Sequence, residues 1–370
     1  MKYLLFLLFV PLIFAQVDSV LQVEEYAPKS TLVVPENILT KSKFPFIDVH
    51  SHQRDMSEEN LQKIANDMDK MNMAVMVKLS GRGFIRHPDG SFGLKPAEEM
   101  YKAIQNIEKT IPGRIILFTN IDFSNIGDDD LAAKTTKQLE EDVKYGAKGL
   151  KIFKSLGMDL KDSNGNRIPV DDSRIDPVWE KCSELGVPVL IHSADPAQFW
   201  KPWDRNNERW FELKEIPGRR RDPDKYPPWE QIISEQHNVF KKHPNTVFIN
   251  AHLGWFGNDL GKLGKLLDEL PNVYTEIGAV LAELGRQPRF ARKWLIKYQD
   301  RVLFGKDSWN PEEYHVYFRV LETADEYFDY YRKRHAFWKM YGLNLPDDVL
   351  KKIYYENALN IIPGLDKKHF

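Results

Sequence analysis

Short apolar runs alternate with amphipathic stretches along most of this chain. Eight runs are rich in Val, Ile, Leu or Phe and lack the strict apolar–polar alternation of a strand that has one face in water. Such runs are typical of strands buried on both faces of a parallel sheet. We therefore predict strands at residues 44–50, 73–79, 114–120, 148–153, 187–192, 246–252, 272–277 and 301–306.

The stretches between these runs have helical spacing. Leu61, Ile64, Ala65 and Met68 form one apolar stripe, and Ser57 precedes it as a predicted N-cap. Eight strand–helix units predict an α/β fold, a (β/α)₈ TIM barrel. An open doubly wound sheet is the main alternative. That fold does not naturally bring the ends of its first, fifth, sixth and last strands to one centre.

Two longer segments interrupt the regular alternation. Residues 193–228 follow the predicted fifth strand, and residues 309–345 follow the eighth. Both are rich in aromatic residues, so we expect loop insertions after strands 5 and 8 that cover the C-terminal mouth of the barrel. Loops in this position commonly carry substrate specificity, although most of their aromatic side chains should pack on one another.

The N-terminal region has a different composition. Lys2 precedes an apolar run from Leu4 to Phe14, and Ala15 offers a small residue before a cleavage point, which predicts a signal peptide over residues 1–15. An uncleaved membrane anchor is the alternative. We expect residues 16–43 to form an N-terminal arm and residues 44–370 to form the barrel domain. The mature protein is then exported, to the periplasm or the extracellular space, and keeps no stable membrane span.

The composition of the chain limits which binding partners and which stabilising bonds we expect. The chain has 52 Lys and Arg against 54 Asp and Glu, a net charge of -2, and no basic tract argues for nucleic-acid binding. The only cysteine is Cys182, so the exported chain must be held by its core rather than by disulfides. We expect Cys182 to be a buried apolar side chain. A small molecule is therefore the expected partner.

Polar residues of matching chemistry end several predicted strands. His50 and His52 lie two residues apart, so both face one side of a strand and can bind a single metal ion. His192, His252 and Asp307 end the fifth, sixth and eighth strands. Because the C-terminal ends of barrel strands meet at one mouth, we expect these side chains to converge there. A divalent ion such as Zn²⁺ suits this set of nitrogen and oxygen donors.

Such a centre predicts hydrolysis. An ion with an open position lowers the pKa of bound water, a carboxylate can accept the proton, and a free imidazole can polarise a carbonyl group. The expected substrate is an amide, ester or lactone. The alternative is a decarboxylase, a carbon–carbon lyase acting on a small carboxylic acid, and an arginine clamp on a carboxylate would favour it. A non-catalytic binding protein would lack at least one of the polar strand ends, and all are present.

From about Phe44 to Leu365 the chain resembles the metal-dependent amidohydrolase superfamily, specifically the amidohydrolase-related branch (amidohydrolase family 2) that includes decarboxylases and lactonases. The motifs are Asp48-Val49-His50-Ser51-His52, Gly149-Leu150-Lys151, Val189-Leu190-Ile191-His192, Ile249-Asn250-Ala251-His252-Leu253-Gly254, Leu303-Phe304-Gly305-Lys306-Asp307 and Tyr355-Glu356-Asn357-Ala358. The resemblance implies that the metal ligands are His50, His52, His192 and Asp307. It implies that His252 is the general base or the group that polarises a carbonyl. Barrels of this branch are often dimers, so a homodimer is also implied.

Lys151 lies on the predicted fourth strand, and its role stays open. Some superfamily members carry a carboxylated lysine on this strand that bridges two metal ions, so the site can hold one ion or two. Lys151 can instead be catalytic or pair with a substrate carboxylate. The third reading is a salt bridge with Glu276 or Asp48. Lys154 has the opposite strand parity, so a regular strand cannot turn both lysines into the barrel.

Two neighbours of the predicted ligands complete the site. Lys306 departs from the family, which more often has a small hydroxylated or polar residue there, and a cation close to Asp307 would lower its pKa and weaken it as a proton acceptor. Glu276, at the end of the seventh strand, is expected to support a metal ligand from outside the coordination sphere. The aromatic insertions suit a substrate that is anionic or contains a ring.

Overall fold

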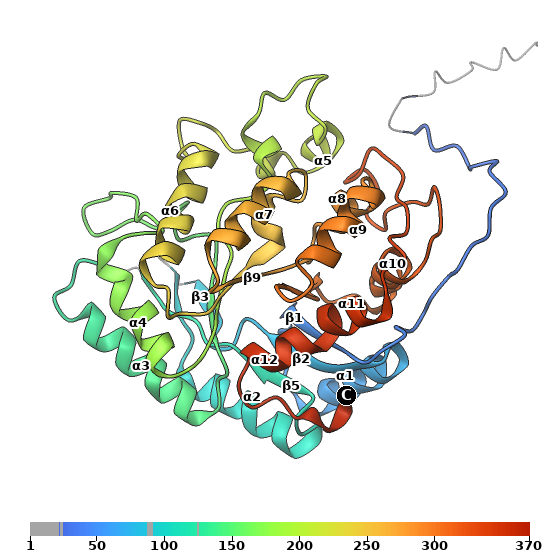
Figure 1. The fold of residues 1–370 in the computed structure, drawn as a ribbon. Helices are drawn as coiled ribbons and strands as arrows, with labels where there is room; N and C mark the ends of the chain where they lie inside the picture. Colours follow the sequence, from blue (N-terminus) through green and yellow to red (C-terminus); the bar gives the residue numbers. More distant parts are fainter. Residues whose placement is uncertain (1–21, 23–24, 87–91, 124–125) are drawn as a thin grey trace, which may run out of the picture. The chain divides into compact units, whose positions relative to one another are not determined.

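The computed structural model describes residues 22, 25–86, 92–123 and 126–370 (Figure 1). The chain separates into two compact units, Met1–Val33 and Val34–Phe370. The described part of the first unit contains no helix or strand. The predicted signal peptide, residues 1–15, lies outside the described residues. Across the described ranges, we find no helix that combines the length and apolar character needed to cross a membrane.

Parallel strands in the second unit occupy eight positions, each within one of the predicted ranges or overlapping it. They are β1 (Phe46–His52), β2 (Met73–Lys78), β5 (Ile115–Leu117), β6 (Leu150–Ile152), β7 (Val189–Ile191), β8 (Phe248–Asn250), β9 (Val273–Glu276) and, in the eighth position, β10 (Val302–Leu303) with β11 (Asp307–Ser308). All residues of β2 and the first six of β1 are buried, as expected for strands covered on both faces.

Strand pairing closes the sheet into a barrel. One sheet has the order β11-β1-β2-β5 and the other the order β10-β9-β8-β7-β6. A parallel bridge between Thr119 and Leu150 joins β5 to β6, and β10 and β11 belong to one chain segment. The register of β1 and β11 places Ser51 beside Asp307. This closure confirms the predicted (β/α)₈ barrel.

Two apolar cores hold the barrel. The smaller contains Val75, Leu190, Ile249 and Leu303, from strands that are not all neighbours, and we assign it as the inner core. The larger joins the outer faces of the strands to the helices and includes the buried, unpaired Cys182, as predicted. Burial of apolar surface in these layers is the main source of stability.

Helices cover the strands (Figure 1). They are α1 (Glu58–Met71), α2 (Ala97–Thr110), α3 (Leu131–Tyr145), α4 (Asp176–Glu184), α5 (Trp210–Glu215), α6 (Trp229–Lys242), α7 (Leu260–Glu269), α8 (Leu281–Gly285), α9 (Pro288–Lys297), α10 (Pro311–Glu322), α11 (Asp347–Lys351) and α12 (Asn357–Ile361). The predicted cap of α1 is confirmed, because the Ser57 side chain accepts a hydrogen bond from the Asn60 N–H. A π-helical turn, Lys352–Glu356, links α11 to α12 and contacts β1 and β10.

The predicted insertions contain more helix than expected. The segment 193–228 includes α5 and two short 3₁₀ turns. The segment 309–345 was predicted as a loop, but it begins with α10, whose Tyr314, Tyr317 and Phe318 are buried in the wall of the barrel. An antiparallel hairpin, β3 (Phe84–Arg86) with β4 (Phe92–Leu94), was not predicted, because each strand is only three residues long.

Candidate functional site

Five of the predicted site residues lie near the C-terminal ends of the barrel strands. His50 and His52 belong to the last part of β1, His192 follows β7, and Asp307 begins β11. His252 lies in a 3₁₀ turn, Ala251–Trp255, that follows β8 directly. Because parallel strands of a barrel end at one mouth, the fold brings these side chains together.

Distances show how closely the five groups meet. The Nε2 atom of His50 lies 3.4 Å from Oδ1 of Asp307, and Nε2 of His52 lies 3.8 Å from the same oxygen. The ring of His252 is 4.7 Å from that of His50 and 4.5 Å from that of His192, centre to centre. All five predicted residues therefore share one cluster.

Glu276 orients two of these imidazoles. Its Oε1 atom lies 3.0 Å from Nδ1 of His50 and accepts the backbone N–H of His252 at 2.6 Å. Nδ1 of His252 donates to the carbonyl oxygen of Gly278 at 2.8 Å. With both Nδ1 atoms protonated, each Nε2 keeps its lone pair for a metal ion or a proton. The expected supporting role of Glu276 agrees with this geometry.

The donor set fits a divalent cation. The Nε2 atoms of His50 and His192 are buried and have no hydrogen-bond partner among the described residues. Unpartnered buried nitrogens are unfavourable, and coordination to a metal ion satisfies them. Donor atoms of His50, His252 and Asp307 all lie within 4.8 Å of one another. The ligand roles of His50, His52, His192 and Asp307, and the base role of His252, stay predictions.

Burial lowers the pKa of three of the imidazoles, and the pKa of the Asp307 carboxyl is also lowered. Burial, with the nearby Lys151, lowers the pKa of His52 to about 4 and that of His50 well below its usual value. Burial and the neighbouring His252 lower the pKa of His192 in the same way. Burial opposes ionisation of Asp307, but His50, His252 and His52 outweigh it and lower its pKa. Neutral imidazole and ionised carboxylate are the forms that bind metal ions.

Lys151 is buried inside β6, and its Nζ lies 5.4 Å from the centre of the Phe153 ring. Its Nζ makes no hydrogen bond to any described residue, so the suggested salt bridge with Glu276 or Asp48 is not formed. Burial lowers its pKa to about 7, although the carboxylates of Asp307 and Glu276 act in the opposite direction. Lys154 pairs with Asp195 at 2.5 Å. Lys154 lies beyond the end of β6, where strand parity no longer applies, and it lines the cavity at the mouth.

Lys306 does not act on Asp307 as the sequence suggested. Its Nζ donates to the carbonyl oxygen of Ser308 at 2.6 Å and forms an ion pair with Glu313. The groups that lower the pKa of Asp307 are imidazoles, and Lys306 is not among its main influences. The expected weakening of Asp307 by this lysine is therefore not seen.

Asp48 is a supporting residue whose role sequence reasoning missed. Its carboxylate accepts the backbone N–H groups of His50 and Lys306, at 2.9 and 3.1 Å, and the hydroxyl of Tyr314 at 2.6 Å. These bonds tie β1 to the segment before Asp307 and so fix His50 against Asp307. Burial raises the pKa of Asp48 to about 7. The sequence did contain a sign of this role, because Asp48 places a carboxylate inside the apolar run 44–50.

Left-handed backbone conformations surround the mouth. His252, Leu253 and Trp255 have φ values of 58°, 53° and 61°, and Asp307 has a φ of 85°. Ala194 and Ala279, which follow β7 and β9, have φ values of 58° and 57°. Such conformations are unfavourable for residues other than glycine and persist where the surrounding structure enforces them, often at functional sites.

A cavity of about 150 Å³ opens over the cluster. It is lined by Lys154, His192, Asp195, Pro196, Phe199, Arg209, Glu212, Arg219, Trp255, Ala279, Ala282, Asp307, Tyr330, Arg332 and His335. Many of these residues come from the two predicted insertions. Residues of both segments therefore line the cavity.

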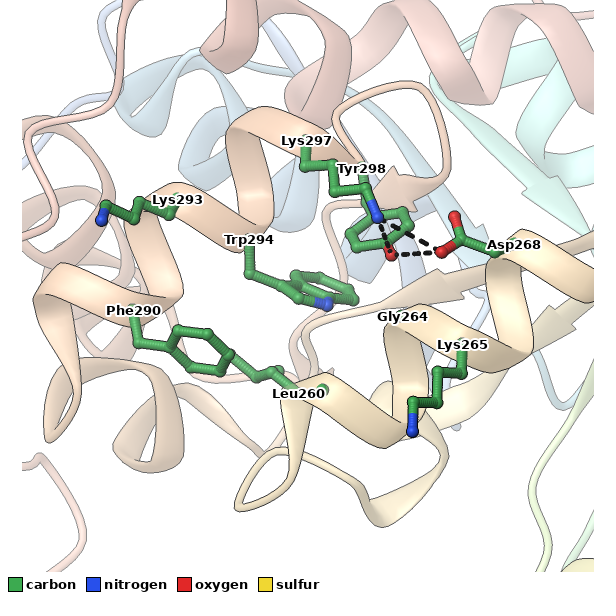
Figure 2. A pocket seen from close by; sticks show the side chains of 10 residues that line it. Leu260, Gly264, Lys265, Asp268, Phe290, Lys293, Trp294, Lys297 and Tyr298 are labelled. Atoms are coloured by element: carbon green, nitrogen blue, oxygen red, sulfur yellow. Dashed lines mark hydrogen bonds and ion pairs between the residues drawn. The ribbon is translucent and has the colours of Figure 1, made fainter.

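A second hollow, of about 320 Å³, lies between α7 and α9 (Figure 2). Phe290 and Trp294 line it, and at one end Tyr298 and Lys297 bond to Asp268. No residue of the histidine–aspartate cluster lines this hollow. The candidate chemistry therefore belongs to the smaller cavity at the barrel mouth.

A (β/α)₈ barrel with histidines and an aspartate at its strand ends defines the class of metal-dependent TIM-barrel enzymes. The family model described as Amidohydrolase matches residues 123–363. The chain therefore belongs to the amidohydrolase family, whose enzymes are metal-dependent, and the resemblance inferred from the motifs is confirmed. The matched region contains His192, His252 and Asp307. No curated sequence matches the chain.

Solved structures support the fold. An uncharacterised TIM-barrel protein from Bordetella bronchiseptica is 14% identical, with 86% of this chain and 98% of that chain covered and a TM-score of 0.53. A dihydroxybenzoic acid decarboxylase from Polaromonas sp. JS666, solved with manganese, is 14% identical (86% and 96% covered, TM-score 0.52). A 2,6-dihydroxybenzoate decarboxylase from Rhizobium is 13% identical (86% and 98%, TM-score 0.51). At these identities the likeness establishes the fold alone.

Proposed function

We propose that this protein is a metal-dependent hydrolase of an amide, ester or lactone. The observation that carries the proposal is the buried, unpartnered Nε2 of His50, which Glu276 orients and which lies 3.4 Å from Asp307. We assign His50, His52, His192 and Asp307 as ligands of one divalent ion, with zinc as the expected metal. Such an ion supplies Lewis-acid activation of water and of a carbonyl group.

The protein's own groups then move the proton. Asp307 is ionised and lies at the cluster, so its carboxylate can accept a proton from water. His252 holds its Nδ1 proton on Gly278, which leaves Nε2 to accept a proton or, once protonated, to donate one to the leaving group. Lys151 is buried beside the cluster, and its Nζ is free to bind an anionic group or to become carboxylated and hold a second ion.

Decarboxylation of a small carboxylic acid is the second candidate. The cavity is lined by Lys154, Arg209, Arg219 and Arg332 against three carboxylates, and an excess of cations favours an acidic substrate. Carbon dioxide release distinguishes the two reactions, because hydrolysis of an amide, ester or lactone releases none. Screening the metal-loaded enzyme against both substrate groups, with detection of CO₂ and of titratable acid, decides between them.

Metal stoichiometry is the first experiment. We expect elemental analysis of protein purified without chelator to find about one zinc or similar ion per chain. His50→Asn should lose the ion, and His315→Asn, a matched change on α10, should keep it. Two ions per chain would place Lys151 in the centre as a carboxylated bridge. No ion, with reloading also failing, would overturn the proposed function.

Export is proposed from residues 1–15 alone. Expression of the full chain with its native leader should deliver a protein that begins near residue 16 outside the cytoplasm. N-terminal sequencing of the extracellular or periplasmic fraction tests this. A chain recovered only in the cytoplasm with residue 1 intact would contradict it.

A further inference from the structure

Most cations at the barrel mouth are already paired with carboxylates of the protein. Lys154 binds Oδ1 of Asp195, and Arg221 binds Oδ2 of the same residue. Arg209 and Arg219 both bind Glu212. Each of these cations therefore already has a carboxylate partner within the folded chain.

Arg332 differs from the other cations of the cavity. Its Nη2 donates to Oγ of Ser308 at 2.6 Å, and its guanidinium lies 5.6 Å from the ring centre of Tyr331. Within the described ranges of the chain, no carboxylate forms an ion pair with it. A guanidinium offers five N–H donors in a planar fork, so Arg332 keeps donors for a further group.

The position of Arg332 links this free charge to the candidate metal centre. Ser308 directly follows Asp307 in β11, so the bond to Ser308 holds the guanidinium beside the cluster. Arg332, His192 and Asp307 line the same cavity. An anion bound by Arg332 would therefore sit within the cavity that also opens on the reacting groups.

Trp255 supplies a second unused donor in this cavity. Its indole Nε1 is buried and has no hydrogen-bond partner among the described residues, and its ring lies 4.6 Å from that of His252. A buried indole N–H normally finds an acceptor. A substrate oxygen would satisfy it, and the ring offers a face for an apolar or planar part of the molecule.

We propose that Arg332 binds a carboxylate of the substrate, so that this enzyme acts on a small carboxylate-bearing molecule with Trp255 as a second hydrogen-bond donor. This inference rests on the proposed function of the same centre. A carboxylate matches the planar guanidinium in a bidentate pair. A phosphate dianion fits less well, because Asp195, Glu212 and Asp307 already line the cavity and would repel its second charge.

Binding of simple probes tests the proposal. Benzoate, its neutral analogue benzamide and inorganic phosphate are titrated calorimetrically into the metal-loaded protein. We expect benzoate to bind to the wild-type protein more tightly than benzamide or phosphate does. In Arg332→Gln the affinity for benzoate should fall about 10- to 100-fold, the usual effect of losing hydrogen bonds to a charged group. The affinity of Arg332→Lys for benzoate should lie between those of the wild type and Arg332→Gln, since lysine keeps the positive charge but lacks the planar set of guanidinium donors.

The matched control is Arg334→Gln, which removes the same charge from the same segment outside the cavity, where Arg334 pairs with Glu215. It should bind benzoate as the wild-type protein does. Equal affinity of Arg332→Gln and wild type for benzoate, or benzamide or phosphate binding as tightly as benzoate, would overturn the proposal.

Repeating the titrations after chelation separates this inference from the proposed function. Benzoate binding that depends on Arg332 and survives chelation supports the carboxylate site even when the metal assays fail. An active metal-loaded enzyme whose KM is the same for matched acid and neutral substrates, in wild type and in Arg332→Gln, keeps the proposed function and overturns the carboxylate site.

Discussion

Glu276 accepts hydrogen bonds inside the barrel from the ring of His50 and from the backbone N–H groups of His252 and Gly278. The space for its carboxylate depends on two glycines, because a Cβ at Gly278 or Gly305 would overlap Oε2 of Glu276. One carboxylate thus sets the tautomer of His50 and the path of the chain after β8. Residues that support metal ligands in this way tune affinity without touching the ion.

Replacing Glu276 should therefore weaken metal binding. In Glu276→Gln the amide can present one oxygen, but its NH₂ group faces donors that need an acceptor. We expect metal affinity to fall about 10- to 100-fold, measured by competition with a chromophoric chelator. Glu208→Gln, which alters an exposed partner of Arg286, is the control. Unchanged affinity in Glu276→Gln would show that Glu276 does not set the centre.

We expect Lys151 to lower the stability of the folded protein while contributing to its activity. Its amino group is buried and has no hydrogen-bond partner among the described residues, which disfavours the folded state. Lys151→Met keeps the volume and removes the polar end, so the free energy of unfolding of the metal-free protein should rise by about 1–2 kcal/mol, measured in urea, while activity falls. A metal-free variant no more stable than the wild type would contradict the interpretation.

The sequence predicted which site residues come together wherever their position depends only on the end of a strand. His50, His52, His192, His252 and Asp307 meet because each follows an apolar run and the barrel aligns the runs. Asp48 and Arg332 were not assigned their roles, since these depend on contacts with Tyr314 and Ser308 that lie far away along the chain or in an irregular segment. Local pattern contains no information about such contacts.

The turn after β8 is the element that places His252. Four successive residues, from His252 to Trp255, have positive φ, and only Gly254 adopts this without strain from a side chain. The turn aims His252 at His50 and His192 and at the same time sets Trp255 over the cavity. Leu253, in the same turn, is buried in the core and holds the turn in place.

Adding a methyl group to this turn should disturb the site. In Gly254→Ala the new Cβ would overlap the side chain of Asn250, in a backbone region that disfavours alanine. We expect a loss of about 2–3 kcal/mol in the free energy of unfolding and a fall in activity. Gly261→Ala on α7 meets only an ordinary contact with Asp259, so it should be neutral or stabilise by up to about 1 kcal/mol. Equal effects of the two substitutions would contradict a special role of the turn.

Helix α6 introduces a dependence of stability on pH. His237 packs against the rings of Phe240 and Phe256, and burial lowers its pKa from 6.5 to about 4. Between these values the unfolded chain binds the proton and the folded chain does not, so stability falls as the pH drops from about 6.5 towards 4. The full effect of this shift is at most about 3 kcal/mol.

Comparing His237→Phe with the wild type isolates this effect. The difference in unfolding free energy between the two proteins should change by about 1–3 kcal/mol from pH 7.5 to pH 4.5, with the variant favoured at the lower pH. The other histidines are common to both proteins and cancel in the difference. Parallel pH profiles would show that His237 does not contribute.

The sequence predicted the positions of the barrel strands accurately, and it predicted the helices and hairpin between them less well. Buried strands have a continuous apolar signal, and each predicted range contains or overlaps an observed strand. Helix α10 was expected to be loop, because its aromatic residues were attributed to packing within an insertion rather than to one buried helical face. The hairpin β3–β4 is too short for periodicity to indicate.

At the scale of the whole molecule, the centre draws its groups from four strands around the ring. An ion bound by the proposed ligands would link β1, β7 and β11, and it would have no equivalent site in an unfolded chain. The binding free energy of such an ion would add to folding stability.

Chelation should lower the melting temperature. An ion at about 100 times its Kd adds about 2.7 kcal/mol to the free energy of unfolding, which for a chain of this size corresponds to a shift of a few degrees. Differential scanning calorimetry before and after dialysis against a chelator, followed by reloading with zinc, measures this shift. A melting temperature that stays constant through the cycle would contradict metal binding at the strand ends.

The pairing of Ser51 with Asp307 also dictates when the centre can come into existence. During synthesis the ribosome releases His50 and His52 long before Asp307, and loop closure over so long a stretch must precede their meeting. A nascent or truncated chain thus has the His-x-His pair but not the carboxylate that completes the set. If the proposed ion needs the full set of ligands, only a chain whose last strand has docked can capture it, and the compartment where this happens must supply the metal.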